Sequence, residues 1–238
     1  MSRRALAQQY KTAPETPARR GQGAAKRSSL EGSRVPHRQS RSVLHVGCGQ
    51  NRLDRLPRPF QNGSWRETRL DLNPDVDPDF ICSITDMAPV PSDSMDAVFS
   101  SHNIEHLFAH EVGDALCEFA RVLKSNGLAI ITCPDVQSVA AVIAEGRLEE
   151  PVYSAPAGPI SPVDILYGHR RSIAAGNTFM AHRTGFTLKS LAAAISRAGF
   201  GAYAGLRRPK TFDLWMVASK GKVSDDALKK ILVDCVTP

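Results

Sequence analysis

The sequence of 238 residues predicts an α/β fold on two observations. From residue 42 onward, short apolar runs alternate with helical patterns, which is typical of parallel strands joined by crossover helices. The first apolar run ends in a glycine turn, and α/β sheets bind their ligands at such strand ends. The chain has 42% hydrophobic residues, enough for one sizeable core, so we expect one main domain over residues 42–220.

The predicted strands are short, apolar or β-branched, and each is closed by Gly, Pro, Asn or Asp. Five of them lie at residues 43–46, 67–72, 80–84, 97–101 and 128–133. Two further runs, 202–206 and 212–219, flank a polar turn that contains Pro209. This pair predicts an antiparallel hairpin.

Helical spacing is clearest in residues 109–127, where Val112, Leu116 and Phe119 recur on one face and Gly127 supplies a stop. We interpret this segment as a crossover helix between two strands. The remaining predicted helices are residues 135–145, 187–198 and 224–233, the last within a C-terminal tail of residues 221–238.

Residues 146–183 form an insertion that is rich in Pro, Gly and Ser and has no sustained period. A segment of this length inside a compact domain is usually a lid or a binding loop. We therefore expect the insertion to contribute to the acceptor site.

The net charge of +6 is concentrated in the first 41 residues, which hold ten Lys or Arg and two Glu. The rest of the chain has a net charge of −2. A segment of Arg, Ser, Gly, Pro and Ala with almost no aromatic residues cannot offset its ordering entropy by burial, so we expect a disordered basic arm. A solvated arm is favoured over a transit peptide or a nucleic-acid-binding segment.

No run approaches the roughly 18 apolar residues of a membrane span, and the N-terminus lacks the apolar segment of a secretory signal. We therefore expect a cytoplasmic protein. The five cysteines are scattered without a C-x-x-C pair, which indicates neither a disulfide framework nor a structural zinc site.

The glycine turn at residues 47–49 is more informative because a carboxylate lies at the end of the second predicted strand. Asp71 lies where α/β folds place an acidic residue against a ribose diol. A dinucleotide site would need a third glycine at position 52, which is Arg52, to present a helix N-terminus to pyrophosphate. A ligand with ribose and no phosphates fits better, so S-adenosylmethionine is favoured and a nicotinamide oxidoreductase is the least favoured alternative.

Five segments, in order, resemble successive motifs of class I S-adenosylmethionine-dependent methyltransferases of the type 11 kind. They are VLHVGCG (43–49), RLDLNPD (69–75), DFICSITDMAPVP (79–91), MDAVFSSHNIEHL (95–107) and FARVLKSNGLAIITCPD (119–135). The resemblance implies a Rossmann-like, seven-stranded, mostly parallel sheet of order 3-2-1-4-5-7-6, with an antiparallel last strand and helices on both faces. It also implies S-adenosylmethionine as cofactor and S-adenosylhomocysteine as product.

The resemblance implies roles for individual residues. Gly47 and Gly49 resemble the loop under the methionine moiety, and Asp71 resembles the acceptor from the ribose hydroxyls. The full implied cofactor set is His45, Val46, Gly47, Cys48, Gly49, Asp71, Leu72, Thr85, Asp86, Met87, Ser101, His102 and Asn103. Within it, Asp86 and Met87 resemble the adenine-edge pair, although Asp86 also suits a surface turn.

Two positions depart from the family pattern. His45 stands where the family usually has Asp or Glu, an acid that helps to hold the ammonium group of the cofactor. The usual third glycine of the motif is replaced by Gln50 or Asn51. These departures keep open the alternative of a catalytically degenerate cofactor-binding module or partner subunit.

His102, Glu105 and His106 spell H-x-x-E-H, which on a helix can bind zinc. The motif directly follows a buried strand, no downstream acidic ligand is indicated, and the family commonly has Glu-His-Leu there. We therefore predict no metal, and the alternative role for Glu105 and His106 is to cap or pin the next helix.

The acceptor is expected to be a small molecule, with anionic metabolites favoured, because four basic side chains border the insertion. These are His169, Arg170, Arg171 and Arg183, for which a solvated loop is the equal alternative. His102 or His182 is the expected base if the acceptor must lose a proton. A nucleic-acid acceptor is disfavoured, since the predicted domain has no excess positive charge.

Overall fold

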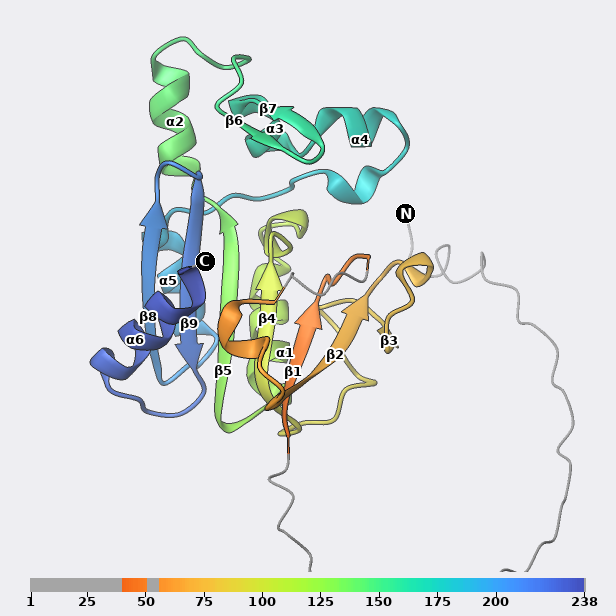
Figure 1. The fold of residues 1–238 in the computed structure, drawn as a ribbon, viewed down its shortest axis with the longest axis vertical. Helices are drawn as coiled ribbons and strands as arrows, with labels where there is room; N and C mark the ends of the chain where they lie inside the picture. Colours follow the sequence, from red (N-terminus) through yellow and green to blue (C-terminus); the bar gives the residue numbers. More distant parts are fainter. Residues whose placement is uncertain (1–39, 51–55, 238) are drawn as a thin grey trace, which may run out of the picture. The chain divides into compact units, whose positions relative to one another are not determined.

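A seven-stranded sheet forms the centre of the structure, a computed structural model that describes residues 40–50 and 56–237 (Figure 1). Its order is β3-β2-β1-β4-β5-β9-β8, and β9 alone among these strands runs antiparallel to its neighbours. The strands are β1 (Arg41–Val46), β2 (Trp65–Asp71), β3 (Phe80–Ile81), β4 (Met95–Ser101), β5 (Leu123–Pro134), β8 (Ala202–Arg208) and β9 (Asp213–Ser219). The predicted fold class is confirmed.

Of the predicted basic arm, residues 1–41, the first 39 lie outside the described residues. Arg41 is already the first residue of β1, where its N–H donates to the Ser64 carbonyl at 2.9 Å. Asn51, one of the two candidates for the missing third glycine, also lies outside the described part.

Two elements differ in length from their predictions. β3 has two residues and not five, because Ser83 and Asp86 pair with each other in a tight turn instead of continuing the ladder. The crossover helix α1 (Val112–Val122) ends five residues before Gly127, since Leu123 has extended backbone angles and pairs with Met95 as the start of β5.

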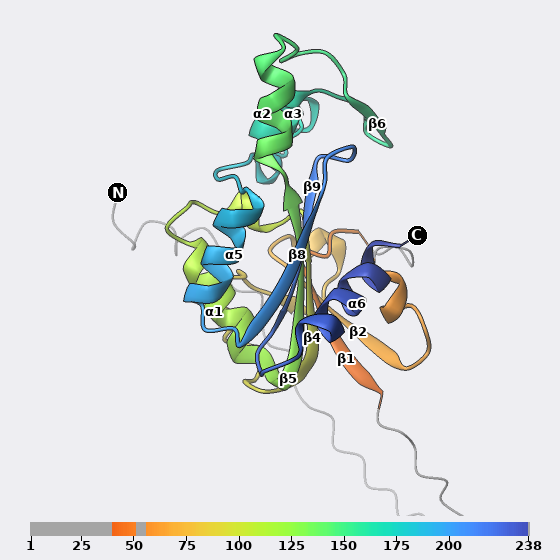
Figure 2. The ribbon, with the colours of Figure 1, turned by 90° about the vertical axis from the view of Figure 1, so that its left-hand side faces the viewer.

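Helices cover both faces of the sheet, as predicted (Figure 2). α1 and α5 (Leu188–Arg197) pack on one face, where Phe119, Leu191 and Ile195 are fully buried. α6 (Asp225–Val236) and the short 3-10 helix η1 (Arg58–Phe60) pack on the other face in a second apolar cluster. Because α6 buries Leu228 and Leu232, this helix belongs to the core although it lies beyond the domain boundary expected at residue 220.

The insertion lies beyond the carboxyl ends of the parallel strands (Figure 1). It follows α2 (Val136–Ala144) and consists of short elements, not irregular chain. These are the hairpin of β6 (Tyr153–Ala155) and β7 (Gly158–Ile160), then α3 (Pro162–Tyr167), α4 (Arg170–Ala174) and the 3-10 helix η4 (Thr178–Met180). The two strands have three residues each, and the helices span fewer than two turns, so none of these elements is long enough to show a hydrophobic period in the sequence.

Within the described residues, no helix is both long and apolar enough to cross a membrane. No disulfide links the five cysteines, all of which are described. Burial raises the pKa of Cys48 to about 11 and that of Cys235 to about 12, so these thiols stay protonated and unreactive near neutral pH.

Candidate functional site

The turn after β1 reverses the chain at the carboxyl edge of the sheet. Gly47 and Gly49 have left-handed backbone angles, with φ of +61° and +57°, which glycine adopts without steric cost. The Cys48 N–H donates to the Leu70 carbonyl at 3.2 Å, so the turn is held against β2. A Cβ at position 47 would lie 2.5 Å from Asn103 Cγ. Position 47 therefore requires glycine both for its backbone angle and for its close approach to Asn103.

Asp71, the last residue of β2, directs its carboxylate at this turn. The Gly49 N–H donates to Asp71 Oδ2 at 2.8 Å, and the Asn73 N–H donates to Oδ1 at 2.9 Å. Each carboxylate oxygen has two lone pairs, so both can still accept from a ligand hydroxyl. Leu72 beside it is 54% exposed and offers apolar surface. The structure thus brings three predicted cofactor residues together.

His45 forms a pair that sequence reasoning missed. Its ring is buried, Nδ1 lies 2.7 Å from Glu67 Oε1, and the ring contacts Phe99 with centroids 5.2 Å apart. His45 thus replaces the acid that the family usually has at position 45, and a carboxylate, that of Glu67, lies beside it on the neighbouring strand. His45 is engaged by this pair, while the buried Val46 next to it contributes to the core.

Arg69 is a second residue of β2 that sequence reasoning missed. Its guanidinium donates to the carbonyls of Gly49 at 2.5 Å and of Val76 at 3.0 Å, the latter in the 3-10 helix η2 (Pro74–Val76). Arg69 therefore ties the glycine turn to the segment after β2. The available signal was the alternation of Glu67, Arg69 and Asp71, which places all three on one face of a strand.

The loop at residues 85–87 departs from its predicted role at one residue. Met87 has no exposed surface and packs in the core, so its side chain is not available to cover an adenine ring, and that expectation is corrected. Asp86 is exposed and accepts from the Ala88 N–H at 3.3 Å, as in a surface turn, which leaves a carboxylate oxygen accessible. Thr85 Oγ1 lies 2.7 Å from Ser83 Oγ.

Two residues of α1 hold this loop in place. Glu118 Oε2 accepts from the Met87 N–H at 2.6 Å, and Arg121 donates to the carbonyls of Met87 and Val90 at 2.8 and 2.9 Å. The hydrogen bond from Arg121 lowers the pKa of Glu118. The Glu-x-x-Arg spacing on a helix was the signal that could have indicated this pair.

The segment after β4 carries two unusual features. His102 has a left-handed backbone with φ of +48°, which is strained for a residue with a Cβ, while its N–H donates to the Thr132 carbonyl at 3.0 Å. Asn103 Nδ2 is buried without a hydrogen-bond partner among the described residues. Ser101 Oγ accepts from Thr132 Oγ1 at 3.0 Å. Backbone strain and an unpartnered donor are thus found together among the predicted cofactor residues Ser101, His102 and Asn103.

Glu105 lies in the 3-10 helix η3 (Ile104–His106) with only 1% of its surface exposed. Burial favours the neutral acid, but three nearby histidines lower the pKa of Glu105 below its ordinary value. The same carboxylate outweighs desolvation of the His102 ring, 3.4 Å away, and raises the pKa of His102. Burial, assisted by neighbouring histidines, lowers the pKa of His182. Near neutral pH, Glu105 is therefore ionised and His182 is neutral.

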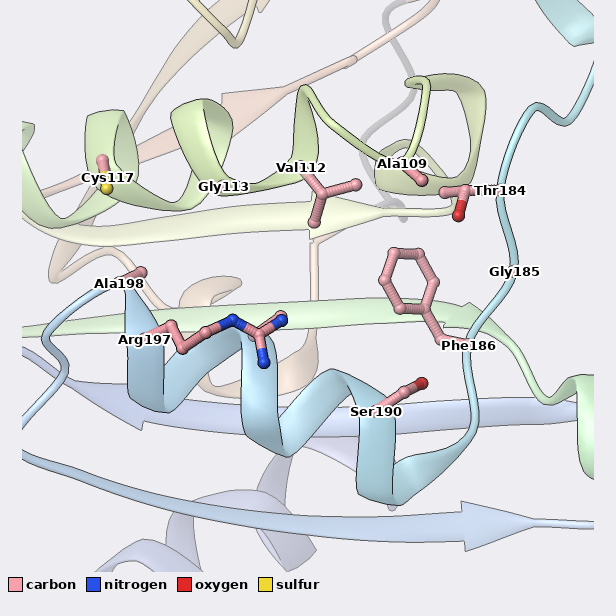
Figure 3. Close-up of a pocket in the computed structure, with 11 residues that line it drawn as sticks. Ala109, Val112, Gly113, Cys117, Thr184, Gly185, Phe186, Ser190, Arg197 and Ala198 are labelled. Atoms are coloured by element: carbon pink, nitrogen blue, oxygen red, sulfur yellow. The ribbon is translucent and has the colours of Figure 1, made fainter.

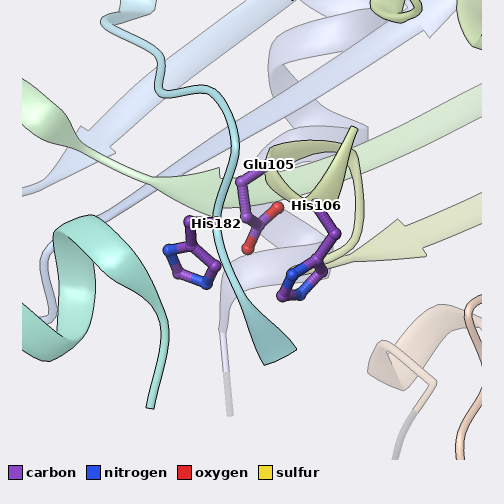
Figure 4. Close-up of side chains that lie close together, drawn as sticks. All are labelled: Glu105, His106 and His182. Atoms are coloured by element: carbon purple, nitrogen blue, oxygen red, sulfur yellow. The ribbon is translucent and has the colours of Figure 1, made fainter. Parts of the chain in front are cut away.

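His182, which is distant in the sequence, lies close to Glu105 and His106 of the H-x-x-E-H segment. Ligand-type atoms of Glu105, His106 and His182 all lie within 4.8 Å of one another (Figure 4). No local pattern announces this approach, because His182 comes from the far end of the insertion. His106 Nδ1 donates to the Ala181 carbonyl at 3.1 Å, which ties η3 to the end of the insertion and not to the next helix α1.

The four predicted acceptor residues do not form one cluster. Arg170 donates to Asp164 Oδ1 at 3.0 Å and lies 3.6 Å from Glu149, so its charge is paired within the insertion, and its substrate role stays a prediction. His169 Nδ1 lies 2.7 Å from Ser172 Oγ at the start of α4. Arg171 is exposed, and its guanidinium lies near Gly158 of β7.

Arg183 is placed differently from the other three. Its N–H donates to the Glu105 carbonyl at 2.8 Å, and its guanidinium stacks over Phe108 at 4.7 Å from the ring centroid. Arg183 is exposed, so it offers a positive charge beside the end of β4. Of the predicted acceptor residues, it is the one that the structure brings to the η3 turn.

Residues 44–131 match the family model described as a methyltransferase domain. Residues 44–131 thus carry a methyltransferase domain, and the sheet order is the one expected for class I S-adenosylmethionine-dependent methyltransferases. The match begins in β1, ends in β5 and contains the turns after β1, β2 and β4. The methyl donor of this methyltransferase is S-adenosylmethionine, and S-adenosylhomocysteine is the product.

Solved structures share the fold of the methyltransferase at low identity. The CMeT domain of the citrinin polyketide synthase has a TM-score of 0.53 and 12% identity over 79% of this chain and 48% of that one. An S-adenosylmethionine-dependent methyltransferase from Methanosarcina mazei has a TM-score of 0.51 and 14% identity over 78% and 94%. A protein from Pyrococcus horikoshii OT3 has a TM-score of 0.50 and 13% identity over 77% and 84%. No curated protein matches the chain.

The methyltransferase also has a groove of ≈ 260 Å³ between α1 and α5 (Figure 3). Its lining includes Val112 and Cys117 of α1, Phe186, and Ser190 and Arg197 of α5. None of the predicted cofactor or acceptor residues lines this groove. It is therefore separate from the candidate site at the strand ends.

Proposed function

We propose that this methyltransferase transfers the methyl group of S-adenosylmethionine to a small anionic metabolite at the carboxyl ends of β1, β2 and β4. The observation that carries the proposal is the cradle formed by Gly47, Asp71 and Asn103. In it a Cβ at position 47 would collide with Asn103, a carboxylate faces the glycine turn, and a buried amide nitrogen lacks a partner. These features suit a ligand that carries hydroxyl donors at one end and an acceptor at the other.

The cradle and its neighbouring residues would each contact a different part of the cofactor. Asp71 accepts hydrogen bonds from the ribose hydroxyls, and Asp86 accepts from the exocyclic amine of adenine through its exposed carboxylate. The backbone at Gly47 allows close approach of the methionine end, and the unpartnered Asn103 Nδ2 donates to an acceptor there. The exposed side chain of Leu72 provides apolar contact for the nucleoside.

When bound, the cofactor supplies an activated methyl group on a sulfonium, so catalysis depends mainly on alignment and on exclusion of water. Between the two candidate bases, the structure favours His102. The Glu105 carboxylate outweighs desolvation and raises the pKa of His102, whereas burial lowers the pKa of His182, so His102 is the stronger base of the two. His182 Nδ1 moreover lies 2.8 Å from the Ile165 carbonyl and is occupied.

An anionic acceptor is supported by Arg183, which is exposed beside the η3 turn. The insertion lies beyond the same strand ends, and its elements are three to six residues long. We propose that residues 146–183 close over the acceptor while Arg183 pairs with its anionic group. Such closure would exclude water from the reacting atoms.

The direct test is methylation of fractionated metabolite pools by the purified enzyme with radiolabelled S-adenosylmethionine. We expect labelled small anions that bind an anion exchanger. Once an acceptor is known, Arg183→Gln should raise its KM about tenfold, as expected for loss of an ion pair of about 1.4 kcal/mol, and leave cofactor affinity unchanged. Arg171→Gln is the matched control and should not change KM. Cofactor binding without turnover on any pool would favour the degenerate module.

The base is tested by His102→Ala across pH. Removal of a general base should lower kcat about a hundredfold and abolish an ionisation near neutrality in the pH profile, with cofactor affinity intact. Full turnover in this variant would exclude His102 as the base. A carboxylate acceptor, which has no proton to lose, would give that result.

A further inference from the structure

Glu105, His106 and His182 form a cluster that the methyl-transfer proposal does not use. Their ligand-type atoms lie within 4.8 Å of one another, and the carboxylate lies between the two imidazole rings (Figure 4). Two of the residues come from η3, directly after β4, and the third follows η4 at the end of the insertion. One carboxylate and two imidazoles are a donor set that divalent transition metals accept.

Main-chain hydrogen bonds hold the two contributing segments together. The N–H groups of Arg183 and Thr184 both donate to the Glu105 carbonyl, at 2.8 and 3.2 Å. The His182 N–H donates to the Tyr167 carbonyl at 3.1 Å, which ties the same segment to α3. The positions of the three side chains are therefore set by backbone contacts, as a preformed ligand site requires.

The two histidines have their tautomers set by backbone carbonyls. His106 Nδ1 lies 3.1 Å from the Ala181 carbonyl, and His182 Nδ1 lies 2.8 Å from the Ile165 carbonyl. A carbonyl oxygen only accepts, so each Nδ1 must carry the proton. In a neutral imidazole, the lone pair is then on Nε2. Metal-binding histidines usually have this arrangement, in which the ring nitrogen away from the metal donates to a carbonyl or carboxylate.

The buried carboxylate of Glu105 has no hydrogen-bond donor among the described residues. It is 1% exposed, and among the described residues neither Oε1 nor Oε2 has a hydrogen-bond donor. Its nearest basic neighbour, His102 Nδ1, is 3.4 Å from Oε1 and belongs to a half-exposed ring. Buried carboxylates are almost always hydrogen-bonded, paired or bound to a metal. A pinning role for Glu105 would have provided such a donor.

We propose that Glu105, His106 and His182 bind one divalent first-row transition metal ion of the zinc, manganese, cobalt and iron(II) class. Mg²⁺ and Ca²⁺ prefer sites built from oxygen ligands alone, so two imidazoles disfavour them. Three protein ligands leave further coordination positions for water or for an oxygen of a ligand. If the proposed acceptor site is correct, this ion lies on the same turn as Asn103 and takes an oxygen of the acceptor.

The first experiment measures metal binding by the full chain, purified without a histidine tag. After treatment with a chelator and equilibrium dialysis against Zn²⁺, Mn²⁺, Co²⁺ or Mg²⁺, we expect one equivalent of a transition metal and no stoichiometric Mg²⁺. Bound Co²⁺ should give visible ligand-field bands without a thiolate charge-transfer band. Absence of stoichiometric binding, or a thiolate band that indicates a cysteine ligand, would overturn the proposal.

Variants then assign the ligands. Glu105→Gln, His106→Gln and His182→Gln should each weaken Co²⁺ binding at least tenfold, whereas His110→Gln, a change in an exposed histidine outside the cluster, should not. Unchanged Co²⁺ affinity in His182→Gln would contradict the assignment. Binding of S-adenosylhomocysteine should persist in all four variants, so that a failure of the metal site is distinguishable from a failure of the cofactor site.

A second measurement needs no variant and therefore covers the case in which a substitution unfolds the protein. X-ray absorption of the zinc-loaded wild-type chain should show about two imidazoles and only oxygen or nitrogen ligands. A sulfur ligand, or a shell without imidazole, would overturn the proposal independently of any substitution.

Discussion

The turn after β1 and the turn after β4 both end parallel strands at the same edge of the sheet, but they are built differently. The first is built mainly by neighbouring strands: Gly47 and Gly49 directly follow β1, and Asp71 ends β2, where its carboxylate accepts from the Gly49 N–H. The second depends on the insertion, because the N–H groups of Arg183 and Thr184 donate to the Glu105 carbonyl and bring the adjacent His182 close to Glu105. The first turn thus rests on contacts between neighbouring strands, while contacts between segments far apart in the sequence assemble the second.

The largest effect is expected in the local region, from Asp71→Ala. Loss of two hydrogen bonds to a charged carboxylate, each about 1.5 kcal/mol or more, should weaken S-adenosylhomocysteine binding about a hundredfold. Calorimetric titration measures it. Asp75→Ala, which removes an exposed carboxylate in η2, is the control and should bind as the wild type does. Equal affinities in the two variants would remove Asp71 from the cofactor site.

Gly47→Ala should have the next largest effect. Both Gly47 and Gly146 have left-handed φ, but a Cβ at 47 meets Asn103 and a Cβ at 146 meets nothing within 4 Å. Backbone strain of about 1–2 kcal/mol is therefore common to both alanine variants, and only Gly47→Ala should also lower cofactor affinity, about tenfold. Thermal melting and calorimetric titration of the pair separate the two causes.

Asp164→Asn tests how an ion pair within the insertion, residues 146–183, contributes to stability. Against its partial burial, hydrogen bonds from Arg170 and Ser161 hold the pKa of Asp164 well below its ordinary value. The carboxylate thus stabilises the fold above its unfolded pKa of about 3.9, and this contribution is lost as the pH falls towards the lower folded pKa.

We expect Asp164→Asn to lower the free energy of unfolding by about 1 kcal/mol at pH 7, since Arg170 is half exposed and screened. Denaturant melts at pH 7 and pH 3 should show that the difference from wild type shrinks in acid. Glu150→Gln removes a more exposed pair with Arg147 and should have almost no effect. A constant difference at both pH values would contradict the ion-pair explanation.

The smallest effect is expected from deletion of residues 1–39. The glycine turn and Asp71 both follow the arm in the sequence, so the arm contributes none of these cofactor residues. The S-adenosylhomocysteine affinity measured by titration should therefore stay within about twofold of that of the full chain. The deletion must end before Arg41, because Arg41 is the first residue of β1. A large loss of binding would show that the arm belongs to the cofactor site.

Patterns of short range predicted most of the fold. The alternation of strands and helices, the hairpin of β8 and β9 and the glycine turn all follow from residues a few positions apart. The errors arose where a long-range contact competes with a local pattern. Leu123 suits the face of α1 but pairs with Met95, and Met87 suits a ligand contact but is drawn into the core.

Contacts between side chains of different elements could not be predicted from the sequence either. Glu118 and Arg121 were readable as helix neighbours, but their attachment to Met87 was not. Arg170 has the composition of an anion-binding residue, yet Asp164 uses its charge. The sequence shows which groups are present, and only packing shows which of them remain available to a ligand.

By itself, the sequence determined the parallel sheet, the glycine turn and the carboxylate after β2, because periodicity and turn residues act over a few positions. The tertiary structure alone decided which charges are paired and which histidine joins the H-x-x-E-H segment. The physical reason lies in the backbone: the Glu105 carbonyl accepts from Arg183 and Thr184, and this contact between distant segments leaves no periodic trace in the sequence.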